Sequence, residues 1–218
     1  MGEAGAVMIA DEADQRTYME RIAELSVGGA ALDLTEPRPL KLTVDDLVLL
    51  DRYWRDDDHK STELIDGRIY TTPARFRPRV NIVQEIWHQL REAAAVAAPH
   101  LFVGMRGSVE ISRFDLPLPD IVLTSEPHGD GFIPAASVPL IVEVAETALD
   151  FYMGEKMRLY ARAGIPEYWV ADVSSCTTYQ MWSPLGKDYG NKQSIPFSNL
   201  VSTETIDGLA ACMSSVET

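Results

Sequence analysis

The chain has 218 residues, of which 46% are hydrophobic and 24% charged, and this length favours one well-buried domain with extensions over two full domains. Its formal net charge of −14 argues against strong non-specific binding of nucleic acid, which depends on a basic surface. No apolar run approaches the roughly 20 residues of a membrane span, and no basic segment followed by an apolar run indicates a secretory signal.

The N-terminal segment of the chain differs from the remainder. Apolar residues at helical spacing predict an amphipathic helix over 11–25, and the prolines within 35–39 predict a linker. We therefore expect an N-terminal helical extension and linker over 1–40 and a domain over 41–218. A disordered terminus is an equally good interpretation of the extension.

The expected domain opens with a helix and a hairpin. Thr43 and Asp46 have the spacing of a capping box and predict a helix to about Tyr53. An Asp-Gly pair within 63–70 predicts two strands joined by a tight turn. The apolar face of 80–98 predicts a longer helix, which a proline directly after it ends.

The second half alternates strands and helices. A helix is expected over 152–163, closed by a glycine and a proline, and a turn-rich region over 186–192. A last strand or turn is expected over 206–212. Strands are expected at 101–103, 108–111, 120–124, 140–145, 168–172 and 177–182. This order predicts an α/β (α+β) domain with a mixed central β-sheet flanked by helices.

Two of these strands carry an isolated carboxylate. Glu143 interrupts the apolar run 140–145, on the same side as Ile141 and Ala145, and Asp120 opens the strand 120–124. A buried carboxylate is costly unless it is paired or binds a metal. If the strands are neighbours, the two acids converge, and such a pair suits a hard cation such as Mg²⁺.

Lys156 comes 13 residues after Glu143, on the helix expected over 152–163. If this helix folds back across its strand, the ammonium reaches the carboxylates. A lysine there would offset negative charge on a phosphate, beside a metal-activated water.

These residues form a pattern that resembles a known family, the bacterial restriction endonucleases often called Uma-type, a branch of the PD-(D/E)XK nuclease superfamily. The resemblance covers residues 42–182, about two-thirds of the chain. Its motifs are Glu-Leu-Ile-Asp-Gly from Glu63, Pro119-Asp120, Ile-Val-Glu-Val from Ile141, Lys156, and the long block from Tyr160 to Asp172.

The resemblance implies a restriction-endonuclease-like fold and a site for metal-dependent cleavage of DNA. It makes Asp120 and Glu143 ligands of Mg²⁺, with Mn²⁺ as an alternative, Lys156 the catalytic lysine and Glu63 a further acidic contributor. In most of the superfamily the lysine stands two residues after the glutamate, where this chain has Ala145.

Two departures from the family pattern leave open the alternative that the chain is an inactive relative that keeps the fold. Tyr152 and Met153 stand where the family often has an Asp-Arg pair, and Arg79 stands where it often has a histidine. Glu143 could also belong to a purely structural ion pair, with Arg106 or Arg158 as its partner.

Aromatic residues in the long block favour a structural interpretation. Tyr160, Tyr168 and Trp169 are expected in the core rather than in a base-stacking platform. The cysteines, Cys176 and Cys212, lie far apart and outside any metal-ligand spacing, which indicates reduced thiols in a cytoplasmic protein.

Three functions are compatible with these residues. The leading hypothesis is an Mg²⁺-dependent endonuclease acting on DNA; the second is a catalytically silent relative that binds nucleic acid or a protein, and the third is a hydrolase of smaller phosphoesters. We also expect a homodimer, formed through the extension and an exposed strand over 177–182. No membrane association is expected.

Overall fold

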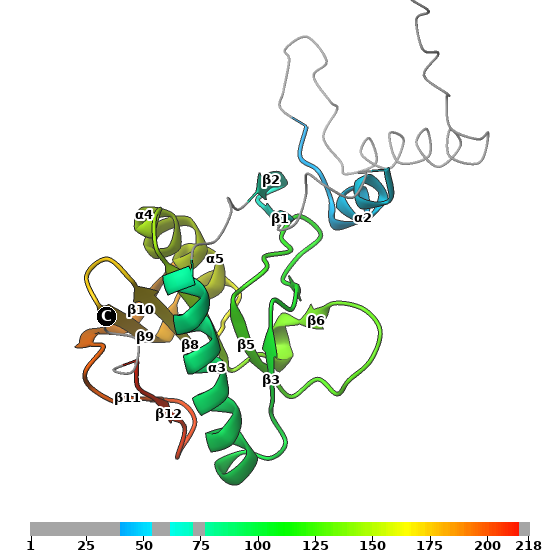
Figure 1. Ribbon diagram of the computed structural model, residues 1–218. Coiled ribbons are helices and arrows are strands. Elements are labelled where there is room, and N and C mark those ends of the chain that lie inside the picture. Colours follow the sequence, from blue (N-terminus) through cyan, green and yellow to red (C-terminus); the bar gives the residue numbers. More distant parts are fainter. Residues whose placement is uncertain (1–39, 54–61, 72–76, 214–218) are drawn as a thin grey trace, which may run out of the picture. The chain divides into compact units, whose positions relative to one another are not determined.

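The computed structural model describes residues 40–53, 62–71 and 77–213 (Figure 1). The helix expected over 11–25 lies outside the described residues, so the division into 1–40 and 41–218 stays a prediction. Among the described helices, none has the length and apolar character needed to cross a membrane.

The first described elements confirm the helix and the hairpin. Helix α2 (Val44–Tyr53) begins at a reciprocal cap: Asp46 accepts from the Thr43 backbone N–H at 2.8 Å, and the Thr43 hydroxyl accepts from the Asp46 N–H at 3.2 Å. Strands β1 (Thr62–Ile65) and β2 (Arg68–Thr71) pair antiparallel. The turn residues between them have φ of 51° and 72°, as a two-residue hairpin turn requires.

A six-stranded mixed sheet forms the centre of the domain, in the order β10-β9-β8-β7-β5-β3 (Figure 1). β7 and β8 are parallel, and the other pairs are antiparallel. The strands are β3 (Phe102–Met105), β5 (Ile121–Thr124), β7 (Leu140–Ala145), β8 (Glu167–Asp172), β9 (Thr177–Leu185) and β10 (Asp188–Pro196). The expected mixed sheet is therefore confirmed.

Helices cover both faces of this sheet. On one face, α3 (Arg77–Ala97) packs its apolar stripe on side chains of β5, β7 and β8. On the other face, the crossover from β7 to β8 packs against the alternate side chains of the same strands. The crossover consists of α4 (Leu149–Phe151), the π-helix η2 (Tyr152–Lys156) and α5 (Met157–Arg162). Both faces being buried explains why β7 reads as a continuous apolar run.

Short elements complete the domain. β4 (Val109–Glu110) pairs with β6 (Ile133–Pro134), and the 3₁₀ helix η1 (Ala135–Ser137) comes directly after β6. Near the end of the chain, β11 (Val201–Ser202) pairs with β12 (Ala210–Ala211). This last hairpin joins the core on the α3 face.

Two expectations about the C-terminal strands were wrong. The region 186–192 is not a turn: only the tip around Gly186 turns, and β10 then runs antiparallel to β9. The segment 177–182 is not an exposed edge, because β9 is hydrogen-bonded to β8 on one side and to β10 on the other. The edges of the six-stranded sheet are β10 and β3.

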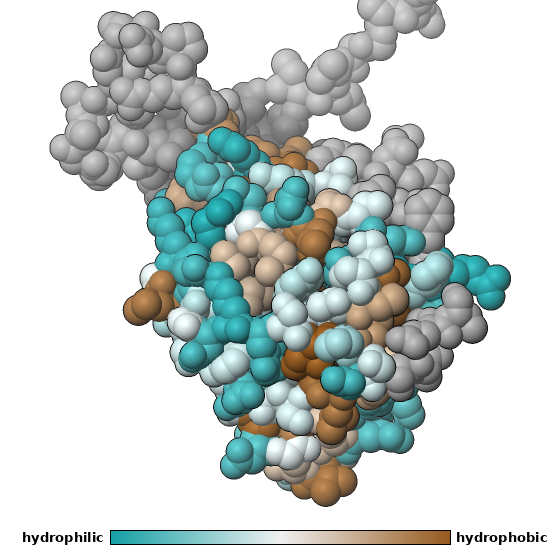
Figure 2. Space-filling model, turned by 90° about the vertical axis from the view of Figure 1, so that its left-hand side faces the viewer, coloured by the Kyte–Doolittle hydropathy of each residue, from teal (hydrophilic) through white to brown (hydrophobic). Residues whose placement is uncertain are grey.

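The aromatic residues of the long block lie in the core, as expected. Tyr160 and Tyr168 are buried on the α5 side and Trp169 on the α3 side, so the successive rings of β8 serve opposite faces. On the surface, Figure 2 shows apolar residues in separate patches among polar ones. Single exposed side chains such as Leu185 and Val96 are ordinary for a globular domain.

Candidate active site

The two carboxylates singled out in the sequence lie side by side. β5 and β7 pair with Ile121 opposite Val142, so that Asp120, one residue before β5, lies opposite Glu143. Alternation along the strands turns both acids towards the face that α5 covers, together with Val122. Both side chains are about 1% exposed.

Lys156 joins this pair to Glu63. The Lys156 Nζ lies 2.7 Å from Glu143 Oε1 and 2.7 Å from Glu63 Oε2. Lys156 ends the π-helix, a local widening that occurs frequently at functional sites. Glu63 comes from β1 and also accepts the backbone N–H of Leu118 at 3.2 Å. All four residues expected in the site, Asp120, Glu143, Lys156 and Glu63, are thus brought together.

Arg79 is a fifth ionisable member, which the sequence marked only as a departure from a histidine. Its Nη2 lies 2.7 Å from Asp120 Oδ2, and its Nε donates to the Val144 carbonyl oxygen at 2.7 Å. Asp120 Oδ2 also accepts the Val144 backbone N–H at 2.9 Å. A signal was available: Arg79 precedes Val83 and Ile86 by four and seven residues, which places a charge on the buried face of α3.

Two tyrosines border the carboxylates. The Tyr160 hydroxyl donates to Glu143 Oε1 at 3.0 Å, so this residue belongs to the site as well as to the core. The Tyr152 ring lies 5.5 Å from Lys156 Nζ, within cation–π range. Sequence patterns hid these roles, because buried tyrosines are common in cores.

Burial and pairing set the charges of the site. Burial raises the pKa of Glu143 to about 7, although Lys156 acts in the opposite direction. Burial alone would lower the pKa of Lys156, but the carboxylates of Glu143 and Glu63 raise it above its ordinary value. Lys156 is therefore a cation at neutral pH. Glu143 does form a buried ion pair, but with Lys156; Arg158, one of the expected partners, binds Glu155 on the surface.

The site contains oxygen atoms of the kinds that a hard divalent cation binds. Carboxylate and backbone carbonyl oxygens are the ligands that Mg²⁺ accepts, and Asp120, Glu143 and the Val144 carbonyl supply them. Lys156 and Tyr160 both bind Oε1 of Glu143. Over the described part of the chain, no three His, Cys, Asp or Glu residues are grouped for a metal. The ligands that the site offers a metal are thus two carboxylates and a carbonyl oxygen, with water completing the set.

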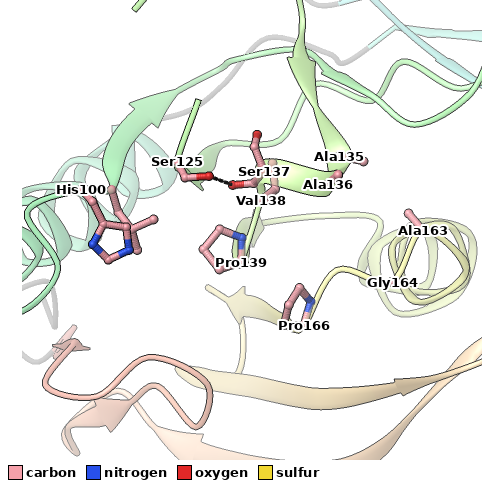
Figure 3. Close-up of a pocket in the computed structure, with 11 residues that line it drawn as sticks. His100, Ser125, Ala135, Ala136, Ser137, Val138, Pro139, Ala163, Gly164 and Pro166 are labelled. Carbon is pink, nitrogen blue, oxygen red and sulfur yellow. Dashed lines mark hydrogen bonds between the residues drawn. The ribbon is translucent and has the colours of Figure 1, made fainter. Parts of the chain in front are cut away.

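A hollow of about 410 Å³ opens at the other end of the sheet (Figure 3). It lies beyond the end of β5 and before the start of β7, lined by Ser125, Pro139 and neighbouring residues. The Ser125 hydroxyl donates to the Ser137 carbonyl oxygen at 3.4 Å. Among the described lining residues His100 alone is ionisable, so this hollow lacks the paired acids expected of a metal-dependent hydrolytic site.

Comparisons with known proteins identify a family and a similar fold. The sequence model of the family described as "Uma2: Putative restriction endonuclease" matches residues 45–213. The fold is similar to that of a protein described as a putative nuclease belonging to DUF820 from Anabaena variabilis ATCC 29413. The TM-score is 0.60 at 13% sequence identity, over 82% of this chain and 97% of that one. No curated protein matches the chain.

Proposed function

The chain belongs to the Uma2 family, and from this membership we propose that it is an Mg²⁺-dependent endonuclease that hydrolyses phosphodiester bonds of DNA. The family and its nuclease-like fold support a nuclease function. The observation that carries the finer proposal is the pair of buried acids on neighbouring strands, Asp120 and Glu143, with the Lys156 amine 2.7 Å from the second.

Asp120 and Glu143 would hold the ion, Mg²⁺ or Mn²⁺, with the Val144 carbonyl oxygen as a third ligand. A bound divalent ion would lower the pKa of its water and stabilise charge on the phosphate. The chain itself fixes the ligand geometry: the Val144 N–H orients Asp120, and the Tyr160 hydroxyl orients Glu143.

Lys156 acts as a fixed positive charge rather than a base. Since the neighbouring carboxylates raise its pKa, it keeps its proton at neutral pH and stabilises negative charge that develops as water attacks the phosphate. Glu63 is a positioning residue, because it binds the same ammonium from β1 and holds it over Glu143.

The partner and cellular setting are also part of the proposal. A net charge of −14 predicts weak binding to DNA, and the proposal includes no membrane partner. Both cysteines are free thiols, which suits the cytoplasm. A homodimer would use β3 or β10, the edges of the six-stranded sheet, since β9 is enclosed.

Nicking of supercoiled plasmid DNA tests this proposal. With Mg²⁺ or Mn²⁺ at low salt, the purified chain should nick plasmid, and Asp120→Asn or Glu143→Gln should lower the rate by at least about a hundredfold. Glu155→Gln is the matched control, because this acid adjoins Lys156 in sequence but is exposed. Nicking that persists in both site variants would end the proposed mechanism.

Burial of the site favours a second candidate, a catalytically silent scaffold that binds nucleic acid or a protein. Each of the five ionisable side chains is at most 6% exposed, and each takes part in an ion pair within the site. Calorimetry separates the two candidates. A correctly folded chain that takes up neither Mg²⁺ nor Mn²⁺ at millimolar concentration would be the scaffold.

A further inference from the structure

Arg79 binds two of the oxygens that the proposed metal would need. One edge of its guanidinium, Nε and Nη2, donates to the Val144 carbonyl oxygen and to Asp120 Oδ2, both at 2.7 Å. The two N–H bonds of this edge are nearly parallel, so their acceptors lie side by side. A carboxylate oxygen beside a carbonyl oxygen is also a pair that a single hard cation can bridge.

The Arg79 guanidinium and a divalent ion cannot bind these two oxygens at the same time. The Arg79 side chain is 6% exposed and that of Asp120 is 1% exposed, so water screens neither strongly. A doubly charged ion beside a guanidinium within a few ångströms would be strongly repelled in such surroundings. Asp120 Oδ2 and the Val144 carbonyl oxygen can therefore serve Arg79 or a divalent ion at full strength, but not both.

Arg79 is also incompletely satisfied where it lies. Its Nη1 is buried and makes no hydrogen bond of ordinary geometry within the described part of the protein. Buried polar groups nearly always have a partner, and a charged group that lacks one carries a desolvation cost. Release of the guanidinium towards water or an anion would remove this cost, which makes exchange with a metal less unfavourable.

We infer that Arg79 is a built-in competitor of the divalent ion: the guanidinium and the metal bind Asp120 and the Val144 carbonyl alternately, and Arg79 thereby sets the metal affinity of the site. This inference rests on the proposed metal-dependent function. It differs from a structural role, because a residue that merely orients Asp120 would strengthen metal binding, and its loss would weaken it.

Calorimetric titration with Mn²⁺ alone tests whether Arg79 weakens or strengthens metal binding. Arg79→Gln, which removes the charge and the fork, should bind Mn²⁺ at least about tenfold more tightly than the wild type. Arg77→Gln is the matched control, because it removes an exposed charge two residues away on the same helix, and its affinity should equal that of the wild type. Asp120→Asn combined with Arg79→Gln should abolish the gain.

Thermal unfolding gives a second readout. Without metal, Arg79→Gln should melt below the wild type, since Asp120 loses its buried partner; with Mn²⁺, its melting temperature should rise by more than that of the wild type. If Arg79→Gln does not fold, Arg79→Met takes its place. Methionine fills a similar space without a charge or a hydrogen-bond donor, so this variant should also bind Mn²⁺ more tightly than the wild type.

Failure of the competitor role and failure of the nuclease proposal give different results. Equal or weaker Mn²⁺ binding by the Arg79 variants, with binding by the wild type that Asp120→Asn removes, would overturn the competitor and leave the nuclease proposal standing. Absence of Mn²⁺ binding by folded wild type and folded Arg79 variants alike would overturn both.

Discussion

Two buried glutamates on neighbouring strands, Glu143 on β7 and Glu167 on β8, are stabilised in different ways. Glu143 faces the α5 side, and its partners are the ammonium of Lys156 and the hydroxyl of Tyr160. Glu167 is fully buried, and its donors among the described residues are all neutral; they come from Trp169, Gln180, Glu204 and Thr205 at 2.6 to 3.0 Å.

The difference shows that burial of a charge does not by itself indicate a catalytic role. Both oxygens of Glu167 are bound by donors that the fold fixes in place, two of them backbone N–H groups, so this glutamate clamps residues 204 and 205 to the sheet. Glu143 is paired mainly with a cation, the Lys156 ammonium, and lies opposite a second buried acid, Asp120. The kind of partner, rather than the burial, therefore distinguishes the candidate site from the structural clamp.

The largest effect on stability is expected when the cation is removed from Glu143. Lys156→Met leaves Glu143 and Glu63 buried without their ammonium, and should cost roughly 3–5 kcal/mol of unfolding free energy at pH 8. Burial already raises the pKa of Glu143 to about 7, and the variant raises it further. The folded variant then holds a proton that the unfolded chain has released above its pKa of about 4.5, so stability falls as the pH rises from that value.

Urea denaturation at pH 5.5 and pH 8 measures this loss, which should be the smaller at pH 5.5. Arg158→Met is the control, because Arg158 binds Glu155 on the exposed side of the same helix and should cost less than about 0.5 kcal/mol. An equal loss from Lys156→Met at both pH values would mean that neither carboxylate takes up a proton when the ammonium is removed.

A smaller loss, without any effect on chemistry, is expected at the clamp. Glu167→Gln keeps the shape but turns one acceptor into a donor that faces donors, and should cost about 2–3 kcal/mol. Nicking per folded molecule should equal that of the wild type, whereas Glu143→Gln should lose it. Folded Glu167→Gln protein with reduced nicking would contradict the division into a clamp and a site.

The sequence allowed the core of the site to be predicted, because the relevant information is local. The apolar run of β7 with a single acid, and the acid before β5, indicate two buried strands with matching charges. One antiparallel pairing then places Asp120 opposite Glu143. The capping residues of α2 and the Asp-Gly turn were predicted for the same reason, since each depends on residues within four positions.

The features that the sequence did not reveal depend on contacts between distant segments. The partners of Arg79 are 41 and 65 positions away, and two donors to Glu167 are 37 and 38 positions away. The sequence predicted a turn-rich region over 186–192, which includes the first residues of β10, because this stretch shows no apolar alternation. The strand conformation of β10 comes from pairing with β9 rather than from its own residues.

The smallest change that tests the comparison removes one hydroxyl that donates a hydrogen bond to each glutamate. Tyr160→Phe takes the 3.0 Å donor from Glu143, and Thr205→Val takes the 2.8 Å donor from Glu167; each should cost about 1.5 kcal/mol in urea denaturation.

The effects of these two variants on metal affinity should differ. Without the phenol, Glu143 is oriented by Lys156 alone, so Tyr160→Phe should weaken Mn²⁺ binding about tenfold, as the loss of a group that orients a metal ligand does. Thr205→Val should leave the affinity unchanged, because Glu167 holds no part of the metal site. Equal Mn²⁺ affinities in the two variants would mean that Tyr160, like Thr205, has a structural role only. The candidate site would then consist of its five ionisable residues.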